Sequence, residues 1–228
     1  MRQETSQKRV RAYAGGRLVA DSARPVLVWE IPYYPTYLLP SADVLATLEP
    51  TDDPVVFDVV VDGMRVPGAA SRLPGLEDLV KLRFDAMDEW LEEDEPIYVH
   101  PRDPYKRVDV LASSRHVVVS VDGVVVAASR QPRILFETSL PPRYYLPLTD
   151  VRMDLLRPSP TRTHCPYKGT ASYWSVDTGQ AVHEDIVWMY RAPLPESQKV
   201  AGLVCFYNEK VDLTVDGSAQ PRPDSPFS

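Results

Sequence analysis

The sequence predicts a mainly β protein made of two tandem domains, each a compact sheet or small barrel with one short helix. Residues 11–44 and 118–151 align without a gap at an offset of 107, so that Gly16 meets Gly123. A period this long indicates a duplicated domain rather than a solenoid. The 228-residue chain also contains 23 prolines. They cluster at the ends of short segments, which favours many short strands joined by stiff turns.

Each repeat opens with a predicted β-hairpin followed by a third strand. The hairpin turns are Gly15–Gly16 in the first repeat and Asp122–Gly123 in the second. Both pairs favour the tight turns that connect antiparallel strands. A proline- and tyrosine-rich segment follows the third strand. A short helix is then predicted to begin at Ser41 or at Thr149, because each residue is a good N-cap with an aspartate close behind it.

The predicted helices end near Leu48 and Leu156, and beyond them the two repeats diverge. The second repeat continues as strands. The first contains an acidic segment, FDAMDEWLEEDE at 84–95, that is predicted to be helical. Residues 107–110 (RVDV) are similar to residues 210–213 (KVDL), so both repeats are predicted to end on a similar strand.

These patterns place a first, divergent repeat domain at residues 1–116 and a second at residues 117–216, which carries the motif THCPYKG. Domains of about 100 residues are common and can build a core without disulfides. The remaining residues, 217–228, read GSAQPRPDSPFS and are predicted to be disordered because they are polar and rich in proline.

Composition narrows the function classes. The formal net charge of -7 makes nucleic acid an improbable partner, because backbone phosphates attract basic surfaces. The sequence has no run of 18 apolar residues and no apolar leader segment, so we expect neither a membrane span nor a secretory signal. Its two cysteines are too few for a disulfide scaffold and are expected to be reduced thiols in the cytoplasm. The sequence contains no pattern that identifies a cofactor or an oligomeric state.

The motif THCPYKGTASYW at 163–174, together with FETSLPPRYYLPLTDVRMDLL at 136–156, resembles the bacterial family called domain of unknown function 427. That family is also labelled a nucleotidyltransferase-like domain. The resemblance covers the second repeat and the first half of the first repeat, which has no CPYK-like segment. It implies a β-tent-like fold and a bacterial protein of the tandem form.

Zinc and nucleotidyl transfer each have a recognisable residue pattern. Many β-tent proteins bind zinc through paired CxxC motifs, and this chain has none. A zinc site would instead require His164, Cys165 and His183 to converge with a fourth ligand. We therefore expect no metal. The chain also lacks a glycine-rich phosphate loop beside a pair of carboxylates, which metal-dependent nucleotidyl transfer commonly uses.

The first candidate site is the motif itself, with His164, Cys165 and Lys168 as the candidate catalytic residues. If the segment is extended, His164 and Lys168 point to one side while Cys165 and Tyr167 point to the other. Lys168 is expected to meet an anionic group and to favour the thiolate of Cys165, and His164 is the candidate for proton transfer. The alternative is a structural cysteine before a proline turn, with the lysine ammonium in solvent.

The candidate ligand-binding residues are a carboxylate that ends the third strand of the second repeat and nearby aromatic residues: Glu137, Tyr144, Tyr173 and Trp188. Phenols and indoles offer flat contact surfaces with a polar edge, which suits a polar ring. Glu30 stands at the position of Glu137 in the first repeat. Core packing is the alternative interpretation of the aromatic residues, and capping of the short helices is the alternative for Asp43 and Asp150.

Together these features suggest a protein that binds a small polar or nucleotide-like molecule in its second domain. The alternative is a structural or protein-interaction module without chemistry, in which the CPYK segment is a turn. The sequence does not decide whether the protein is an enzyme.

Overall fold

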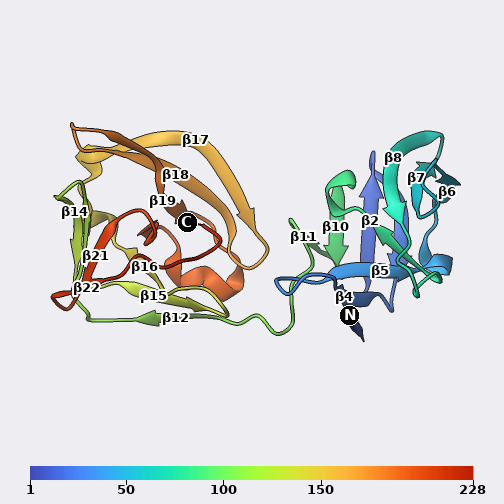
Figure 1. Cartoon of the computed structure of the whole chain (residues 1–228), viewed down its shortest axis with the longest axis horizontal. Helices are drawn as coiled ribbons and strands as arrows, with labels where there is room; N and C mark the ends of the chain where they lie inside the picture. Colours follow the sequence, from blue (N-terminus) through green and yellow to red (C-terminus); the bar gives the residue numbers. More distant parts are fainter. Residues whose placement is uncertain (228) are drawn as a thin grey trace. The chain divides into compact units, whose positions relative to one another are not determined.

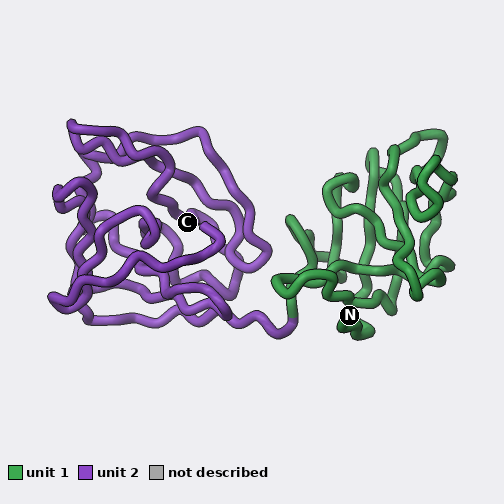
Figure 2. The backbone as a smooth tube through the Cα atoms, viewed as in Figure 1, with its two compact units in different colours: residues 1–103 green, residues 104–228 purple. Residues whose placement is uncertain are grey.

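The computed structural model describes residues 1–227 and divides the chain into two compact units. The first unit comprises residues 1–103, and the second begins at Pro104 (Figures 1 and 2). The regular structure of both units is mainly antiparallel strands, which confirms the predicted mainly β fold. Within residues 1–227 no helix is long and apolar enough to cross a membrane.

The first unit contains a seven-stranded sheet in the order β1-β4-β5-β9-β8-β7-β6 and a four-stranded sheet in the order β11-β10-β2-β3. Its strands are β1 (Arg2–Thr5), β2 (Val10–Ala14), β3 (Arg17–Ser22), β4 (Val26–Trp29), β5 (Thr36–Pro40), β6 (Thr47–Pro50), β7 (Val56–Val61), β8 (Met64–Ser71), β9 (Leu79–Leu82), β10 (Glu89–Glu92) and β11 (Glu95–Ile97). One hydrophobic core, to which residues of both sheets contribute, fills this unit.

The second unit repeats this arrangement, with a seven-stranded sheet in the order β12-β15-β16-β20-β19-β18-β17 and a four-stranded sheet in the order β14-β13-β21-β22. Its strands are β12 (Val108–Ala112), β13 (Val117–Val121), β14 (Val124–Ser129), β15 (Arg133–Glu137), β16 (Arg143–Leu146), β17 (Leu156–Cys165), β18 (Gly169–Asp177), β19 (Val182–Tyr190), β20 (Val204–Phe206), β21 (Asp212–Val215) and β22 (Ser218–Gln220).

The strand orders of the two units correspond one for one, including the halves whose sequences diverge. An isolated bridge between Ala20 and Val44 recurs between Ala127 and Val151, at the same offset of 107. The hairpin turns at Gly15–Gly16 and Asp122–Gly123 have φ values between +51° and +77° at all four residues. Such left-handed pairs match the twist of the flanking strands. The two units can therefore be compared position by position.

The predicted helices are shorter than expected. They form single 3₁₀ turns, η1 (Ser41–Asp43) and η3 (Leu148–Asp150), each with its aspartate in the first turn. In the first unit the chain then returns to extended structure, and β6 begins before the predicted helix end. The other 3₁₀ helices are η2 (Phe84–Ala86), η4 (Met153–Leu155) and η5 (Pro195–Val200).

The helix predicted at 84–95 is wrong. After η2, residues 89–92 form strand β10, which pairs antiparallel with β2. Trp90 and Glu92 face inward, at 2% and 8% exposure, whereas Glu89 is exposed. The Glu92 carboxylate accepts a hydrogen bond from the Tyr37 hydroxyl at 2.8 Å. Buried and more exposed side chains alternate along this strand, although most of the residues around it are acidic. The buried carboxylate is tolerated because it has hydrogen-bond partners.

The division between the units also differs from the predicted boundary at residue 116. Strand β12 pairs with β15 over its whole length, from Val108 to Ala112, and therefore opens the second unit. It corresponds to β1, which pairs with β4 in the first unit. The similarity between residues 107–110 and 210–213 was misleading, because the latter lead into β21, which pairs with β13.

The tail predicted to be disordered makes ordered contacts as far as residue 227. Strand β22 pairs with β21. Further on, the Ser225 hydroxyl bonds to the Glu209 carboxylate, and the Phe227 ring lies 6.3 Å from that of Tyr207. Backbone pairing and one aromatic contact order this polar segment. Neither interaction can be predicted from the amino-acid composition of the segment.

Candidate ligand-binding site

The seven-stranded sheet of the second unit buries residues on both of its faces. One face packs against the four-stranded sheet through a core that contains Val119, Leu146 and Leu213. The opposite face carries a separate cluster without any residue of the four-stranded sheet, which we call the outer-face cluster. Its buried members are Val110, Leu135, Tyr145, Ala171, Tyr173, Trp188, Tyr190, Val200 and Cys205.

Hydrogen bonds connect the aromatic members of the outer-face cluster. The Trp188 indole nitrogen donates to the Tyr145 hydroxyl at 3.1 Å, and the Tyr173 hydroxyl lies 2.8 Å from the Thr163 hydroxyl. Burial raises the pKa of Tyr145 and of Tyr190 well above the ordinary phenol value. These phenols therefore stay protonated and act as hydrogen-bonding, rigid walls.

A buried ion pair lies on the same face. The guanidinium of Arg143 donates to both carboxylate oxygens of Glu209 at 2.7 Å, and the two side chains are only 8% and 1% exposed. The guanidinium also lies 5.6–5.8 Å from the ring centres of Trp188, Tyr207 and Phe227. Burial acts to raise the pKa of the Glu209 carboxyl, but hydrogen bonds from Arg143 and Ser225 outweigh it and the pKa is lowered.

Glu137 and Lys168, both predicted site residues, form an ion pair, with side chains 9% and 13% exposed. Glu137 ends β15, and Lys168 lies in the turn between β17 and β18. In the first unit Glu30, the counterpart of Glu137, also has a lysine partner, Lys81, at 2.6 Å. A lysine partner for this glutamate is therefore common to both units.

The two lysines come from different strands. Tyr145 pairs with Cys205, and its counterpart Leu38 pairs with Lys81, so Lys81 occupies the place of Cys205. Cys205 is fully buried, and burial raises the pKa of its thiol to about 12. The lysine partner thus lies in the turn of the motif in the second unit and in the sheet in the first, and the second unit has a sulfur atom at that sheet position.

The predicted residues divide into two groups. Glu137, Lys168, Tyr173 and Trp188 share the outer face of the sheet. Half-buried Cys165 lies with them: it is two residues from Thr163, whose hydroxyl meets Tyr173, and together with burial it raises the pKa of Tyr190. Residues 166–168 form a turn, which ends the strand alternation and brings Lys168 to this side. The expectation that Lys168 points away from Cys165 is therefore corrected.

His164 and Tyr144 do not join this group. His164 pairs with Thr170, and its Nδ1 lies 2.9 Å from the Thr170 hydroxyl on the exposed, opposite side of the β17–β18 hairpin. Tyr144 packs against the core between the sheets. Strand alternation explains both positions, because His164 adjoins Cys165 and Tyr144 adjoins Tyr145, and these two neighbours point to the outer face.

The outer-face cluster distinguishes the two units. Strand registers identify the residues of the first unit that correspond to its main members. They are small or apolar residues where the second unit has an arginine and aromatic rings, with Thr36 at the place of Arg143, Leu38 at Tyr145, Val56 at Tyr173 and Ser71 at Trp188.

A cavity of ≈ 500 Å³ opens at one end of β12 and β15, among residues that the sequence analysis did not select. A smaller one of ≈ 260 Å³ shares Ala112 and Arg133 with it and adds Lys199. Arg133 precedes Leu135 by two residues, so the cavity lies at the edge of the outer face. Its lining includes Ala112, Ser113, Arg130, Arg133, Pro147 and Leu203.

The cavity is cationic. Within residues 1–227, the guanidinium groups of Arg130 and Arg133 have neither a hydrogen bond nor an ion-pair partner. The Lys199 ammonium donates to the Val110 carbonyl at 3.3 Å, and it has no other partner in the part of the chain that the structure describes. The nearby Asp216 carboxylate has its own partner in Arg115 at 2.8 Å, and this bond, with a smaller contribution from Arg130, lowers the pKa of Asp216. Unpaired guanidinium groups in a concave site are available to an anion.

One backbone hydrogen bond beside the cavity recurs in both units, but the charged side chains differ. Ser113 N donates to the Pro132 carbonyl at 3.0 Å, as Ser6 N does to that of Pro25 at 2.8 Å. Arg130 and Arg133, however, correspond to Ala23 and Val26. Arg24, at the place of Gln131, faces the Asp43 carboxylate at 4.0 Å. Lys199 lies on η5, between β19 and β20. The corresponding segment of the first unit, between β8 and β9, contains turns and no helix.

No group of three or more histidine, cysteine, aspartate or glutamate side chains within residues 1–227 is placed to hold a metal ion.

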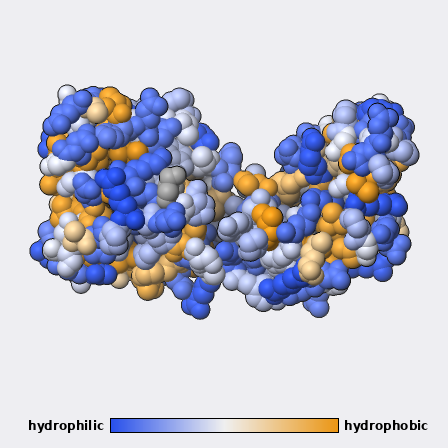
Figure 3. Space-filling view, viewed as in Figure 1, coloured by the Kyte–Doolittle hydropathy of each residue, from blue (hydrophilic) through white to orange (hydrophobic). Residues whose placement is uncertain are grey.

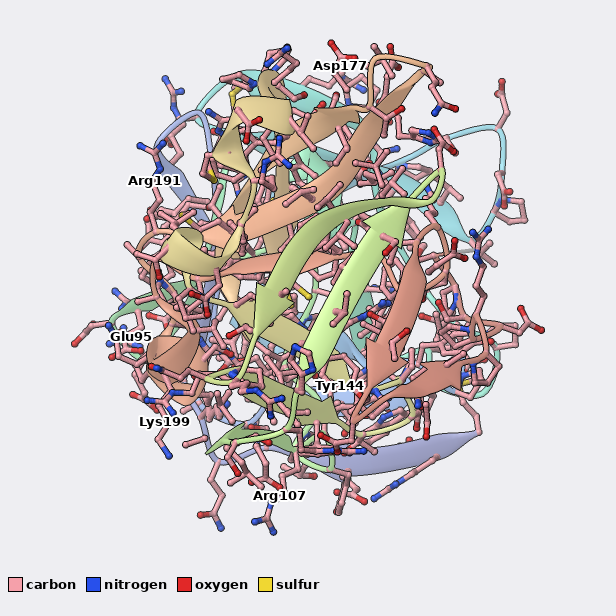
Figure 4. The ribbon with its side chains drawn as sticks, turned by 90° about the vertical axis from the view of Figure 1, so that its left-hand side faces the viewer. Glu95, Arg107, Tyr144, Asp177, Arg191 and Lys199 are labelled. Carbon is pink, nitrogen blue, oxygen red and sulfur yellow. The ribbon has the colours of Figure 1, made fainter. Side chains whose placement is uncertain are left out.

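Lys199 lies on η5, and Figure 4 shows it well apart from Arg191. On the face of the second unit shown in Figure 3, hydrophobic residues form small patches among hydrophilic ones.

A family model described as a domain of unknown function, DUF427, with the name NTP_transf_9, matches residues 2–57 and 109–217. The match covers more than half of the chain. The chain belongs to the DUF427 family. The two matched segments begin at Arg2 and Asp109, which are 107 residues apart, so the DUF427 match begins at corresponding positions of β1 and β12. No curated protein matches the sequence.

Proposed function

We propose that this DUF427 protein binds a small polar or nucleotide-like molecule in its second unit, and that the first unit is a duplicated scaffold without that site. The observation that carries the proposal is the cavity of ≈ 500 Å³ with two unpaired arginines, whose counterparts in the first unit are Ala23 and Val26. Pockets for small molecules commonly measure about 300–1,000 Å³.

The outer-face cluster packs against residues that line the cavity. Leu203 lines the cavity and packs against the cluster, and Arg133 is the direct strand neighbour of fully buried Tyr145. The sheet therefore fixes the backbone that presents the arginine. A binding site held on strands loses little entropy when the ligand arrives.

A binding role fits the geometry better than nucleophilic catalysis at the motif. A base must lie within hydrogen-bond reach of the thiol that it activates. His164 and Cys165 are on opposite sides of the hairpin, and the Lys168 ammonium is engaged by Glu137. Residues of the motif shape the sheet edge in this proposal, and they do not form a catalytic pair.

The test fills the cavity with a bulky side chain. Ser114 lines the cavity, and exposed Gln7 occupies the corresponding position of the first unit. Thermal unfolding of the intact wild-type protein, Ser114→Trp and Gln7→Trp is measured with nucleotides, sugar phosphates, amino acids and dicarboxylates. A ligand at 100 times its Kd adds about 2.7 kcal/mol to the stability of the folded state. This corresponds to a rise in Tm of about 5–10 °C.

We expect at least one compound to stabilise the wild type and Gln7→Trp equally and to leave Ser114→Trp unchanged. A compound that stabilises all three proteins binds elsewhere and contradicts the assignment to the second unit. Wild-type protein that responds to no compound favours the structural or protein-interaction module instead.

A further inference from the structure

We infer that the cavity binds the phosphate group of a phosphomonoester, held by Arg130, Arg133 and Lys199. This inference rests on the proposed function and adds the ligand class and the residues that recognise it. Its starting point is the presence of unpaired cations in one cavity of a protein with a net charge of -7. Local cations in a concave site can attract an anion despite the net negative charge of the whole protein.

The number of cations decides between a phosphate and a single carboxylate. Two guanidinium groups and one ammonium group border the two cavities, whose linings share Ala112 and Arg133. A phosphomonoester carries about -1.5 to -2 charges at neutral pH and presents three acceptor oxygens. A single carboxylate carries one charge and would leave two of the three cations without a counter-ion. The dianion therefore matches the site better.

Several arginines of the second unit outside the cavity are paired with carboxylates. Arg107, Arg115 and Arg152 each have a carboxylate within 3.0 Å. Asp216, the carboxylate whose pKa responds to Arg130, is already bonded to Arg115 and to the backbone N–H of His116. A ligand that supplies an oxyanion would thus complete a set of donors that the chain leaves open.

The cavity also has room and contacts for the rest of the molecule. Pro147, Leu203 and Ala112 provide apolar surface, and Ser113 and Ser114 provide hydroxyl groups beside the arginines. A volume of ≈ 500 Å³ exceeds what an inorganic phosphate needs. A phosphate esterified to a sugar or to another small organic group fits this division between a cationic end and an apolar wall.

The experiment compares phosphorylated and unphosphorylated forms of the same molecule. Glucose 6-phosphate and AMP are titrated by calorimetry into the intact protein, beside glucose and adenosine. The variants are Arg130→Ala and Arg133→Val, which introduce the residues found in the first unit. Arg191→Ala is the charge control, because within residues 1–227 this exposed arginine likewise has no partner and it lies outside the cavity.

We expect at least one phosphomonoester to bind the wild type and its unphosphorylated form not to bind measurably. Arg130→Ala and Arg133→Val should each weaken binding about 10- to 100-fold, the usual effect of losing a hydrogen bond to a charged group. Arg191→Ala should bind like the wild type. Raising the salt concentration from 50 to 500 mM should weaken wild-type binding, because exposed charges are screened.

Two results would overturn the inference. One is the absence of binding by both phosphomonoesters, and the other is equal binding by Arg133→Val and Arg191→Ala. The proposed function can survive either result: a neutral compound that stabilises the wild type but not Ser114→Trp would show a ligand site of different chemistry. If no compound of either kind binds, both the inference and the proposed function fail.

Discussion

Replacing Glu209 by glutamine lowers the free energy of unfolding of the second unit by about 3–5 kcal/mol, the usual cost of breaking a buried ion pair. The substitution keeps the shape of the side chain but leaves the Arg143 guanidinium, 8% exposed, without its carboxylate. It also weakens the bond from Ser225, which holds the end of the described chain. Urea unfolding followed by tryptophan fluorescence measures the change.

The pH dependence provides a second readout. The pKa of Glu209 is lower in the folded protein than in the unfolded chain, so its stabilising contribution is present above the unfolded pKa and is lost as the pH falls through the folded pKa. The wild type should lose this contribution under acid conditions, whereas Glu209→Gln lacks it at every pH. The exposed pair Arg152–Asp154 is the control, because Asp154→Asn should leave stability nearly unchanged. Equal stabilities of the wild type and Glu209→Gln would show that the pair does not hold the outer face together.

Trp188→Ser costs the second unit about 3–5 kcal/mol, within the range for emptying the site of a buried aromatic ring. Serine is the residue of the first unit at this place, Ser71. The change removes a side chain of 6% exposure, its bond to the Tyr145 hydroxyl and its contact with Tyr207 at 4.5 Å. Thermal and urea unfolding monitored by circular dichroism measure the loss.

The matched control is Ser71→Ala, which should alter stability little because it removes only one hydroxyl group. A loss below about 1 kcal/mol for Trp188→Ser would contradict the account, since buried aromatic residues of this size contribute more. It would mean that the outer-face cluster can repack around the gap, as the first unit does with smaller side chains.

The hairpins of both units could be predicted from sequence because their signals are local. Gly15–Gly16 and Asp122–Gly123 adopt the left-handed geometry that their residue types favour. The repeat was visible for the same reason, since it keeps these turns and Pro25 and Pro132 in register. Local backbone preference was enough here.

Strand β10 and the boundary between the units required information about distant partners. The segment 84–95 is rich in residues that suit helices, yet β10 pairs with β2, about 80 residues earlier in the sequence. Residues 107–112 have no local feature that shows whether they pair backward or forward in the chain. Long-range pairing decided both cases.

None of the site residues chosen from the sequence lines the cavity, and their orientations could not be predicted. One face of the sheet carries Glu137, Lys168, Tyr173 and Trp188. His164 lies on the opposite side, because the turn at 166–168 ends the alternation that would have put Lys168 on the side of His164. The cavity arginines were missed because single arginines are ordinary surface residues. Aligning the two repeats would have identified one of them, because apolar Val26 of the first repeat corresponds to the cation Arg133 in the second.

Hydrogen–deuterium exchange of the intact protein, with and without saturating glucose 6-phosphate or AMP, shows which unit binds the ligand, because each unit is a control for the other. If the cavity binds the ligand, exchange slows at residues 111–115, 129–134 and 195–204, which surround the cavity. We expect no change at residues 4–8 and 22–27, their counterparts in the first unit. Slower exchange in the first unit, or in the second unit only outside those segments, would contradict binding in the cavity.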